Sequence, residues 1–265
     1  MMLDVNHVYK TFHPGTINER RALAGVDLHL EEGDFVTVIG GNGAGKSTLL
    51  NAVAGVWPVD GGSIVIDGND ITGLPDYKRA PFIGRVFQDP MMGTAPDMQL
   101  EENLALAYRR GKKLGLRWHI NREERDMYRE RLRELNLGLE DRLTTKVGLL
   151  SGGQRQAVTL LMASLQKPRL LLLDEHTAAL DPATAAKVLE LSDRIVQENG
   201  LTTMMITHNM KDAIRHGNRL IMMNKGEIIF DCRGEEKAKL TVGDLLEKFA
   251  QISGSTLDND RALLG

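Results

Sequence analysis

The sequence predicts an α/β fold built around a phosphate-binding loop, and three observations support this prediction. Residues 35–39 (FVTVI) are all apolar or β-branched, which predicts a buried strand. Directly after them, residues 40–47 (GGNGAGKS) fit the pattern G-x-x-x-x-G-K-[ST]. Further along the chain, apolar strands alternate with helical segments, which is typical of a sheet covered by helices.

The loop supplies the groups that a bound phosphate needs. Glycines let backbone N–H groups point at a phosphate, and the following helix offers its free N-terminal N–H groups to the same anion. Lys46 is expected to reach the β- and γ-phosphates, and the Ser47 hydroxyl is expected to bind Mg²⁺. The alternative is a chance glycine turn before a helix. The predicted nucleotide-binding residues are Gly40, Gly41, Asn42, Gly43, Ala44, Gly45, Lys46, Ser47 and Thr48.

Composition excludes several classes of protein. Of the 265 residues, 42% are hydrophobic and 26% are charged, as in ordinary globular proteins, and a net charge of −3 gives no overall attraction to nucleic acid. The single Cys232 cannot form an internal disulfide and is expected to be a buried filler. The N-terminus does not resemble a signal peptide, and no apolar run approaches the ~20 residues of a membrane span. Any action at a membrane would therefore require a partner.

The first part of the chain is predicted to be rich in strands. Alternating apolar residues predict strands over residues 3–8 and 24–30, and a third over 63–66 that resumes at Ile71. One helix is expected behind the phosphate loop. Residues 82–87 (FIGRVF) predict a further buried strand that ends before Gln88.

Residues 98–137 are predicted to be helical. Helices are expected over residues 100–111 and 120–136, with Tyr128, Leu132 and Leu135 recurring on one face of the second. A solvated helix end is favoured for the nearby basic cluster, and a contact with a partner or lipid headgroups is the alternative. The cluster consists of Arg109, Arg110, Lys112, Lys113 and Arg117.

The last third of the chain returns to alternating strands and helices. Residues 169–173 predict an apolar strand, and Asp181-Pro182 predicts the start of a helix that ends near residue 200. A strand over residues 203–207 leads to His208, and a hairpin is predicted at residues 224–226. The polar tail after Leu257 is expected to be loosely ordered.

Polar residues at strand ends are the candidate catalytic groups. Asp174 is expected to bind Mg²⁺ at the carboxyl end of its strand, whereas Glu175 points differently and can orient or deprotonate water. His208 is expected beside the γ-phosphate, and the Gln88 amide is expected near Mg²⁺ and the attacking water. A surface turn for the two carboxylates and a core histidine for His208 are the alternatives.

A second anion-binding helix start is predicted at residues 150–154 (LSGGQ). A Ser-Gly-Gly turn is expected to precede a helix over residues 157–165. One bound nucleotide does not need two such sites in one chain. The motif therefore predicts a head-to-tail dimer in which each chain closes the ATP site of the other.

In this order, the motifs resemble the ATP-binding subunit of an ABC transporter over almost the whole chain, to about Phe230. GGNGAGKST resembles the Walker A loop, LSGGQ the signature, LLLLDE the Walker B strand and Ala179-Leu180-Asp181 the D-loop. The resemblance implies that Phe12 stacks on adenine, that Gln88 is the Q-loop residue and that His208 is the switch histidine. It implies an ATP hydrolase that uses ATP and Mg²⁺, with catalytic Glu175, His208 and Gln88, metal ligands Ser47, Gln88 and Asp174, and contacts across the dimer from Ser151, Gly152, Gly153 and Gln154.

The resemblance also implies an organisation and partners. One ABC ATPase domain would span residues 1–265, with a catalytic core over 1–88 and 151–232, a helical subdomain over 89–150 and a C-terminal extension over 233–265. An integral-membrane permease, a solute-binding protein and a second copy of the chain are the implied partners, without nucleic acid. The implied location is cytoplasmic, at the inner face of the cell membrane.

The chain departs from the family pattern at two places. His176 replaces the usual proline after the Walker B glutamate, and TLLMASL replaces an Ala-Arg-Ala run. His176 is expected to fill the space of proline, and the alternative is a contact with the partner chain. The variant LLLLDEHTAALDP resembles a bacterial subgroup found with a lipoprotein-type binding protein and a separate permease, some of which take up aromatic amino acids.

Import is favoured because stand-alone ATPase chains are common in bacterial uptake systems that resemble this one. The alternatives are an exporter ATPase subunit, a soluble ABC ATPase that moves no solute and a phosphate-loop kinase. The sequence does not name the solute.

Overall fold

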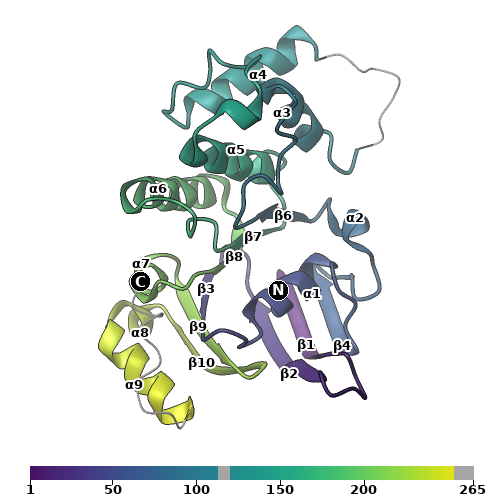
Figure 1. Cartoon of the computed structure of the whole chain (residues 1–265), viewed down its shortest axis with the longest axis vertical. Helices are drawn as coiled ribbons and strands as arrows, with labels where there is room; N and C mark the ends of the chain where they lie inside the picture. Colours follow the sequence, from purple (N-terminus) through teal and green to yellow (C-terminus); the bar gives the residue numbers. More distant parts are fainter. Residues whose placement is uncertain (113–119, 254–265) are drawn as a thin grey trace. The chain divides into compact units, whose positions relative to one another are not determined.

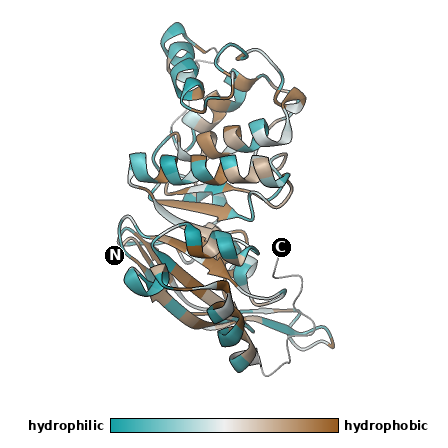
Figure 2. Cartoon of the chain, turned by 90° about the vertical axis from the view of Figure 1, so that its left-hand side faces the viewer, coloured by the Kyte–Doolittle hydropathy of each residue, from teal (hydrophilic) through white to brown (hydrophobic). Residues whose placement is uncertain are grey.

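The computed structural model describes residues 1–112 and 120–253, which form two compact units (Figure 1). The first unit combines residues 1–79 with the chain from Gly200 onward, and the second spans Ala80–Asn199. The second unit therefore includes the predicted helical subdomain, residues 89–150, together with flanking strands and helices. Both units combine strands and helices, as the sequence predicts. In Figure 2 the strands are mostly brown, because their residues are hydrophobic, whereas the helices mix brown with teal.

An antiparallel sheet of four strands occupies the N-terminal part of the first unit, in the order β2-β1-β4-β5. The predicted strands are confirmed, and three of them are longer than expected. Ile71 follows the last short strand and donates its backbone N–H to Ile64 O at 2.9 Å, so pairing resumes two residues earlier than predicted. The strands are β1 (Leu3–Phe12), β2 (Arg20–Leu30), β4 (Gly61–Ile66) and β5 (Asn69–Asp70).

A second set of strands in the first unit surrounds β3 (Phe35–Ile39), whose five residues are all buried. The strand is parallel to β8 (Thr202–Ile206) on one side and to β9 (Arg219–Asn224) on the other. The predicted hairpin joins β9 to β10 (Glu227–Arg233), and Lys225 and Gly226 both have positive φ, as a type I′ turn requires. The helices are α1 (Lys46–Ala54), α2 (Asp76–Arg79), α7 (Met210–Arg215), α8 (Glu235–Ala238) and α9 (Val242–Ser253).

A buried arginine holds the end of α1. The Arg79 side chain is 2% exposed and donates to the carbonyl oxygens of Ala52 and Val53 at 2.7 and 2.9 Å. Carbonyl groups in the last turn of a helix have no partner within the helix, and a positive charge is favourable there. Arg79 therefore stabilises the helix that follows the phosphate loop.

In the second unit, β6 (Ile83–Val86) and β7 (Leu170–Asp174) pair in parallel, and both predicted strands are confirmed to within one residue at each end. Tyr128 and Leu132 are buried on one helix, as the predicted periodicity requires, whereas Leu135 is buried in the turn after the helix, which ends at Arg133 rather than at residue 136. The helices are α3 (Leu100–Tyr108), α4 (Arg122–Arg133), the 3₁₀ turn η1 (Val147–Leu149), α5 (Gly152–Ser164) and α6 (Pro182–Asn199).

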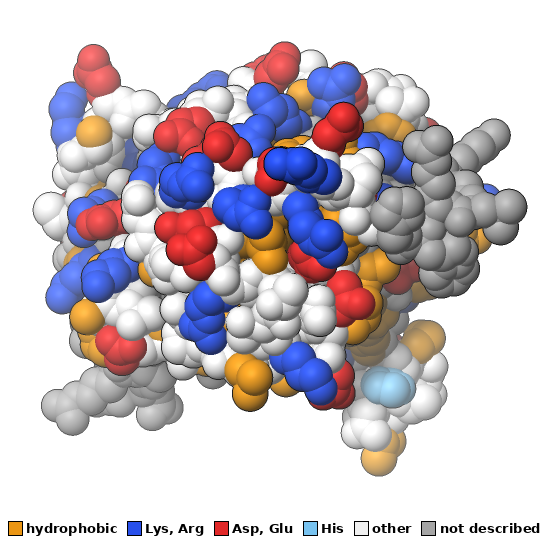
Figure 3. Space-filling model, turned by 90° about the horizontal axis from the view of Figure 1, so that it is seen from above, with side chains coloured by type: hydrophobic (Ala, Val, Ile, Leu, Met, Phe, Trp, Pro, Cys, Tyr) orange, Lys and Arg blue, Asp and Glu red, His pale blue; other side chains and the backbone are white. Residues whose placement is uncertain are grey.

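Charges of both signs are mixed on the exposed side of α4 (Figure 3). Arg129 pairs with Asp126 at 2.8 Å and Arg133 with Glu130 at 3.1 Å. Exposed pairs of this kind contribute little to stability. The described residues of α4 therefore do not form a surface of a single charge sign.

The described side chains of the basic cluster contact other residues of the second unit. Arg109 pairs with Glu124 at 3.1 Å, and Arg110 donates to the Ala163 carbonyl at 3.2 Å. Lys112 lies 3.7 Å from the centre of the Tyr108 ring. Lys113 and Arg117 lie outside the described residues. Arg109 and Arg110 are therefore held by partners rather than forming the solvated helix end that the sequence favours.

Within the described residues, no helix combines the length and the apolar character that a membrane span needs.

Candidate functional site

The phosphate loop follows β3 and depends on glycine at two positions. Gly40 and Gly45 both have positive φ, at 148° and 105°. A Cβ at Gly40 would collide with the carbonyl oxygen of Met223, and one at Gly45 would lie 2.6 Å from the carbonyl oxygen of Ala22. Only glycine fits both positions, so the sequence pattern has a direct steric cause.

The Lys46 side chain is buried within the loop and donates hydrogen bonds to the loop backbone. It is 5% exposed, and its Nζ donates to Gly40 O at 2.7 Å and to Gly41 O at 3.2 Å. Helix α1 begins at Lys46, and its N-cap Gly45 offers no side-chain acceptor to the first turn. A helix start without a capping side chain, beside a buried ammonium group, fits a bound phosphate.

Two neighbours bind the outside of the loop. Gly226, in the β9–β10 turn, donates its N–H to Ala44 O at 2.9 Å, and Arg20 donates to Gly43 O at 3.0 Å. The Ala24 N–H donates to Gly226 O at 2.9 Å, which ties the turn to β2. Neither Arg20 nor the hairpin turn is predicted from the sequence as part of this site, because both come from distant segments.

Phe12 ends β1 and is half-buried. Its ring meets Trp57 edge to face, with 4.9 Å between ring centres and 82° between ring planes. Trp57 therefore orients the ring that the resemblance assigns to adenine. Trp57 is not among the site residues predicted from the sequence.

His208 lies between β8 and α7 and is partly buried. The next residue, Asn209, caps α7 by accepting from the N–H groups of Lys211 and Asp212 at 2.9 and 3.3 Å. Its own N–H donates to the Thr207 hydroxyl at 3.1 Å. The backbone on both sides of His208 is thereby restrained.

In the second unit, Asp174 ends β7 and pairs with an arginine of the neighbouring strand. Arg85 Nη2 donates to Asp174 Oδ2 at 3.2 Å, and the Arg85 guanidinium lies 4.5 Å from the centre of the Phe87 ring. Burial lowers the pKa of Arg85, and the charge of Asp174 opposes this shift. A charged residue inside the apolar segment FIGRVF is the sequence feature that could have identified this partner.

Glu175 follows Asp174 with a φ of 47°. A positive φ is uncommon for a residue with a side chain and often occurs at functional positions. The different backbone conformation of Glu175 is compatible with the expectation that its side chain and that of Asp174 take different roles. Gln88 follows β6 and is exposed.

The signature motif starts helix α5 through a capping box. The Ser151 hydroxyl accepts from Gln154 N–H at 3.3 Å, and Gln154 Oε1 accepts from Ser151 N–H at 3.2 Å. Gly152 and Gly153 lie in the first turn of the helix, so the predicted helix start at residue 157 is wrong. The reason is that this reciprocal pair satisfies backbone donors and offsets the low helix propensity of glycine.

A groove of about 710 Å³ lies beside the signature. Its lining includes the N-cap Ser151 with Gly153 and Gln154 of α5, and Thr184, Lys187 and Arg194 of α6. The exposed Ser151 and the two basic side chains give this groove hydrogen-bond donors.

His176 lies inside the second unit. Its side chain is 2% exposed, and Nε2 lies 2.9 Å from Ser192 Oγ. Because the Ser192 hydroxyl donates to Val188 O at 2.8 Å, the hydroxyl oxygen accepts from the histidine. The His176 side chain is therefore buried and hydrogen-bonded within its own chain.

All of the predicted site residues lie in the described part of the chain. The first unit contains Phe12, the loop from Gly40 to Thr48, and His208, whereas the second contains Gln88, Asp174, Glu175 and the signature. Within the described residues, no group of three or more His, Cys, Asp or Glu side chains is arranged to hold a metal ion. The predicted Mg²⁺ set has only one carboxylate, and Mg²⁺ commonly takes its other ligands from phosphates and water.

Comparisons with known proteins agree on one family. The sequence model of the family described as "ABC transporter" matches residues 23–178. A tyrosine transport ATP-binding protein of Clostridioides difficile is 46% identical over 254 residues, which cover 94% of this chain and 98% of that protein. A xylose/arabinose import ATP-binding protein of Sulfolobus acidocaldarius is 33% identical over 250 residues, covering 94% of this chain and 95% of that protein.

Two solved structures are similar in fold and sequence. A dimeric ATP-binding cassette bound to ADP and Pi has a TM-score of 0.74 and 30% identity, covering 88% of this chain and 98% of that one. The ADP conformation of another ATP-binding cassette of an ABC transporter has a TM-score of 0.77 and 28% identity, covering 96% of this chain and 99% of that one.

Proposed function

Since this chain belongs to the ABC transporter family of ATP-binding proteins, has the ABC ATPase fold, and binds and hydrolyses ATP, we propose that it powers solute import through a separate membrane permease. The observation that supports a nucleotide-driven dimer is that one chain contains both a glycine-dependent phosphate loop and a capped signature helix. The phosphate loop belongs to the first unit and the signature to the second.

In this proposal, the first unit binds the nucleotide. Gly40 to Thr48 surround the phosphates, Lys46 neutralises charge on the β- and γ-phosphates, and Phe12 stacks on adenine. His208 donates a hydrogen bond to the γ-phosphate. Lys46 leaves the loop carbonyl oxygens and turns to the phosphates when ATP binds, which its present hydrogen bonds to Gly40 and Gly41 allow.

The second unit supplies the groups for hydrolysis. Glu175 accepts a proton from the attacking water, and Gln88 orients that water through its amide. Ser47, Gln88 and Asp174 would hold Mg²⁺, which neutralises charge on the phosphates when it is bound. Arg85, paired with Asp174 at 3.2 Å, orients that carboxylate.

Two copies of the chain would enclose two ATP molecules head to tail. Ser151, Gly152, Gly153 and Gln154 of one copy would contact the γ-phosphate that the phosphate loop of the other copy holds. The Ser151 hydroxyl accepts a backbone N–H, and its own proton remains able to donate to a phosphate. Closure would exclude water and add positive potential where charge develops during phosphoryl transfer.

The direction and the solute are inferred from the relatives. Their names are those of transport and import proteins, and one relative is a tyrosine transport ATP-binding protein. We propose import of an aromatic amino acid, with a lipoprotein-type solute-binding protein as the further partner. The subdomains over residues 1–88 with 151–232, 89–150 and 233–265 belong to the same proposal, in which residues 89–150 and the Q-loop contact the permease at the inner face of the membrane.

The test is to purify the tagged chain in mild detergent from its native membranes and to identify every partner. A permease with a solute-binding lipoprotein is the expected result, and that lipoprotein should bind tyrosine or phenylalanine more tightly than leucine. A permease with a periplasmic adaptor and no binding protein would replace import by export. Isolation without any membrane partner would contradict the transport function and support the soluble ATPase.

A further inference from the structure

The C-terminal helix α9 has one apolar face. Thr241 and Asp244 cap its start, because the Asp244 carboxylate accepts from the Thr241 N–H at 2.8 Å and the Thr241 hydroxyl accepts from the Asp244 N–H at 3.3 Å. Leu245 and Phe249 follow one helical turn apart and are 0% and 8% exposed. This spacing directs both side chains to the same side of the helix.

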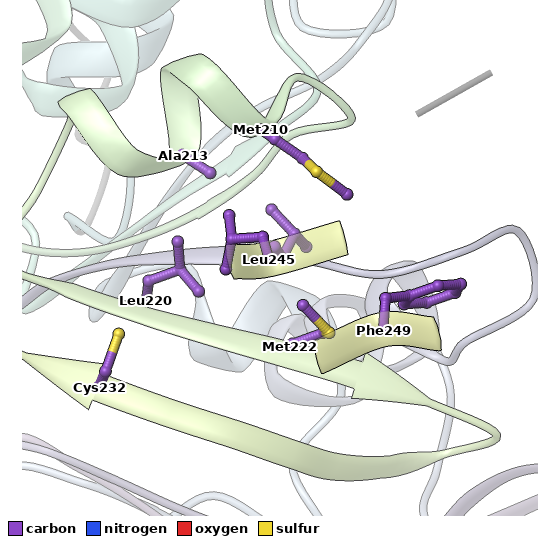
Figure 4. Packing of buried hydrophobic residues seen from close by; sticks show 8 residues of the cluster. Met210, Ala213, Leu220, Met222, Cys232, Leu245 and Phe249 are labelled. Carbon is purple, nitrogen blue, oxygen red and sulfur yellow. The ribbon is translucent and has the colours of Figure 1, made fainter. Parts of the chain in front are cut away.

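That face packs into a buried cluster next to the phosphate loop: in Figure 4, Leu245 and Phe249 lie near Leu220 and Met222 of β9 and Met210 of α7. Leu245 and Phe249 belong to one buried cluster with side chains of β3, α7, β9 and β10. Ile39, the last residue of β3 and the neighbour of Gly40, is part of the cluster. The other members are Met210, Ala213, Leu220, Met222 and Cys232.

Phe249 reaches the loop itself. Its Cζ lies 3.4 Å from the position that a Cβ on Gly41 would occupy. Apart from the chain neighbours of Gly41, no other heavy atom of the described residues comes within 4 Å of that position. The phenylalanine ring is therefore the packing partner of this glycine on its side-chain side.

The same cluster extends toward the segment that contains His208. Met210 begins α7 two residues after His208, and it packs in the cluster with Phe249. Helix α9 thus supports the start of the phosphate loop and the start of the helix after His208. Both contacts lie within the first unit.

We propose that Phe249 is a positioning residue that holds the phosphate loop in its nucleotide-binding conformation. A loop rich in glycine has few side chains of its own to restrict its backbone, so a neighbouring ring at Gly41 reduces the conformations that must be lost on binding. Nucleotide affinity then depends on the ring of Phe249 at Gly41, rather than on the docking of α9 in general. The inference rests on the proposed role of Gly40 to Thr48 in phosphate binding.

The test compares two truncations on the same helix. For Phe249→Ala we expect about fivefold weaker binding of a fluorescent ADP analogue and a KM for ATP raised by a similar factor, with kcat changed less than twofold. The matched control is Leu245→Ala, which removes a more deeply buried side chain of the same cluster. It should lower the melting temperature at least as much, yet change nucleotide affinity less than twofold.

A second variant separates positioning from folding. Phe249→Leu keeps an apolar side chain in the cluster, so it should fold like the wild type while it still weakens ADP binding, because leucine is shorter than the ring that reaches Gly41. Equal losses of affinity in Phe249→Ala and Leu245→Ala would overturn the inference, and so would wild-type affinity in both Phe249 variants.

Lys46→Ala distinguishes this inference from the proposal on which it rests. If Lys46→Ala abolishes binding while the Phe249 variants bind normally, only the positioning role is wrong. If Lys46→Ala also binds the ADP analogue normally, the phosphate loop itself is misassigned.

Discussion

At the scale of single residues, burial controls the chemistry of the one cysteine. Cys232 is 2% exposed, and burial raises the pKa of its thiol to about 11. The negative charges of Glu236 and Asp231 contribute smaller parts of this rise in the pKa. The expected filler role is confirmed by this burial.

We therefore predict that the Cys232 thiol is unreactive in the folded protein. The thiolate is the reactive form, and a pKa of about 11 leaves about one thiol in a thousand ionised at pH 8. Ellman's reagent at pH 8 should label the native chain many times more slowly than the chain in guanidinium chloride, which serves as the control. Rapid stoichiometric labelling of the native protein would show that the side chain is accessible and ionised.

At the scale of elements, the start of α5 combines a structural and a binding role in one side chain. The Ser151 hydroxyl accepts from Gln154 N–H at 3.3 Å and is exposed. The cap uses the oxygen as an acceptor, whereas the proposed phosphate contact uses the hydroxyl as a donor. Substitutions can separate the two roles because aspartate accepts hydrogen bonds but, when ionised, does not donate them.

Ser151→Ala should lower the free energy of unfolding by about 1 kcal/mol, since it removes the cap. Ser151→Asp should keep that stability, because aspartate caps as well as serine and its charge suits a helix N-terminus. Both variants should lose ATP-dependent dimerisation, and aspartate should lose it completely through repulsion from the γ-phosphate. Denaturant unfolding and size-exclusion chromatography with ATP measure the two effects. A Ser151→Asp chain that dimerises like the parent would disprove the contact across the dimer.

At the scale of the whole molecule, ATP is expected to control the association of two chains. Glu175→Gln keeps the size of the side chain and removes its ability to accept a proton, so ATP should bind without being hydrolysed. We predict that this variant doubles its apparent mass with ATP and Mg²⁺ but not with ADP, as measured by light scattering after gel filtration. The matched control, Glu175→Gln with Lys46→Ala, should stay monomeric. ATP turnover by Glu175→Gln at the wild-type rate would exclude Glu175 as the base.

Local patterns in the sequence were enough to predict the elements that surround the chemistry. The strands before Gly40 and at residues 170–174, the hairpin turn at Lys225-Gly226 and the helix cap at Asp181 all occur where expected, and Asp181 Oδ1 accepts from Thr184 N–H at 3.1 Å. Each depends on residues within a few positions of one another. Apolar periodicity, glycine conformation and capping are properties of such short segments.

The sequence by itself therefore determined the family, the order of the motifs and the residues proposed to bind ATP. Even a local pattern can be misjudged, since the capping box at Ser151 starts α5 earlier than the predicted residue 157. Only the tertiary structure decided which distant groups support those residues. Arg85 and Asp174 are 89 positions apart, and Arg79 and Ala52 are 27 apart. Phe249 meets Gly41 from the far end of the chain. Such pairs are not specified by spacing, because they depend on which faces come together when the chain buries its apolar surface.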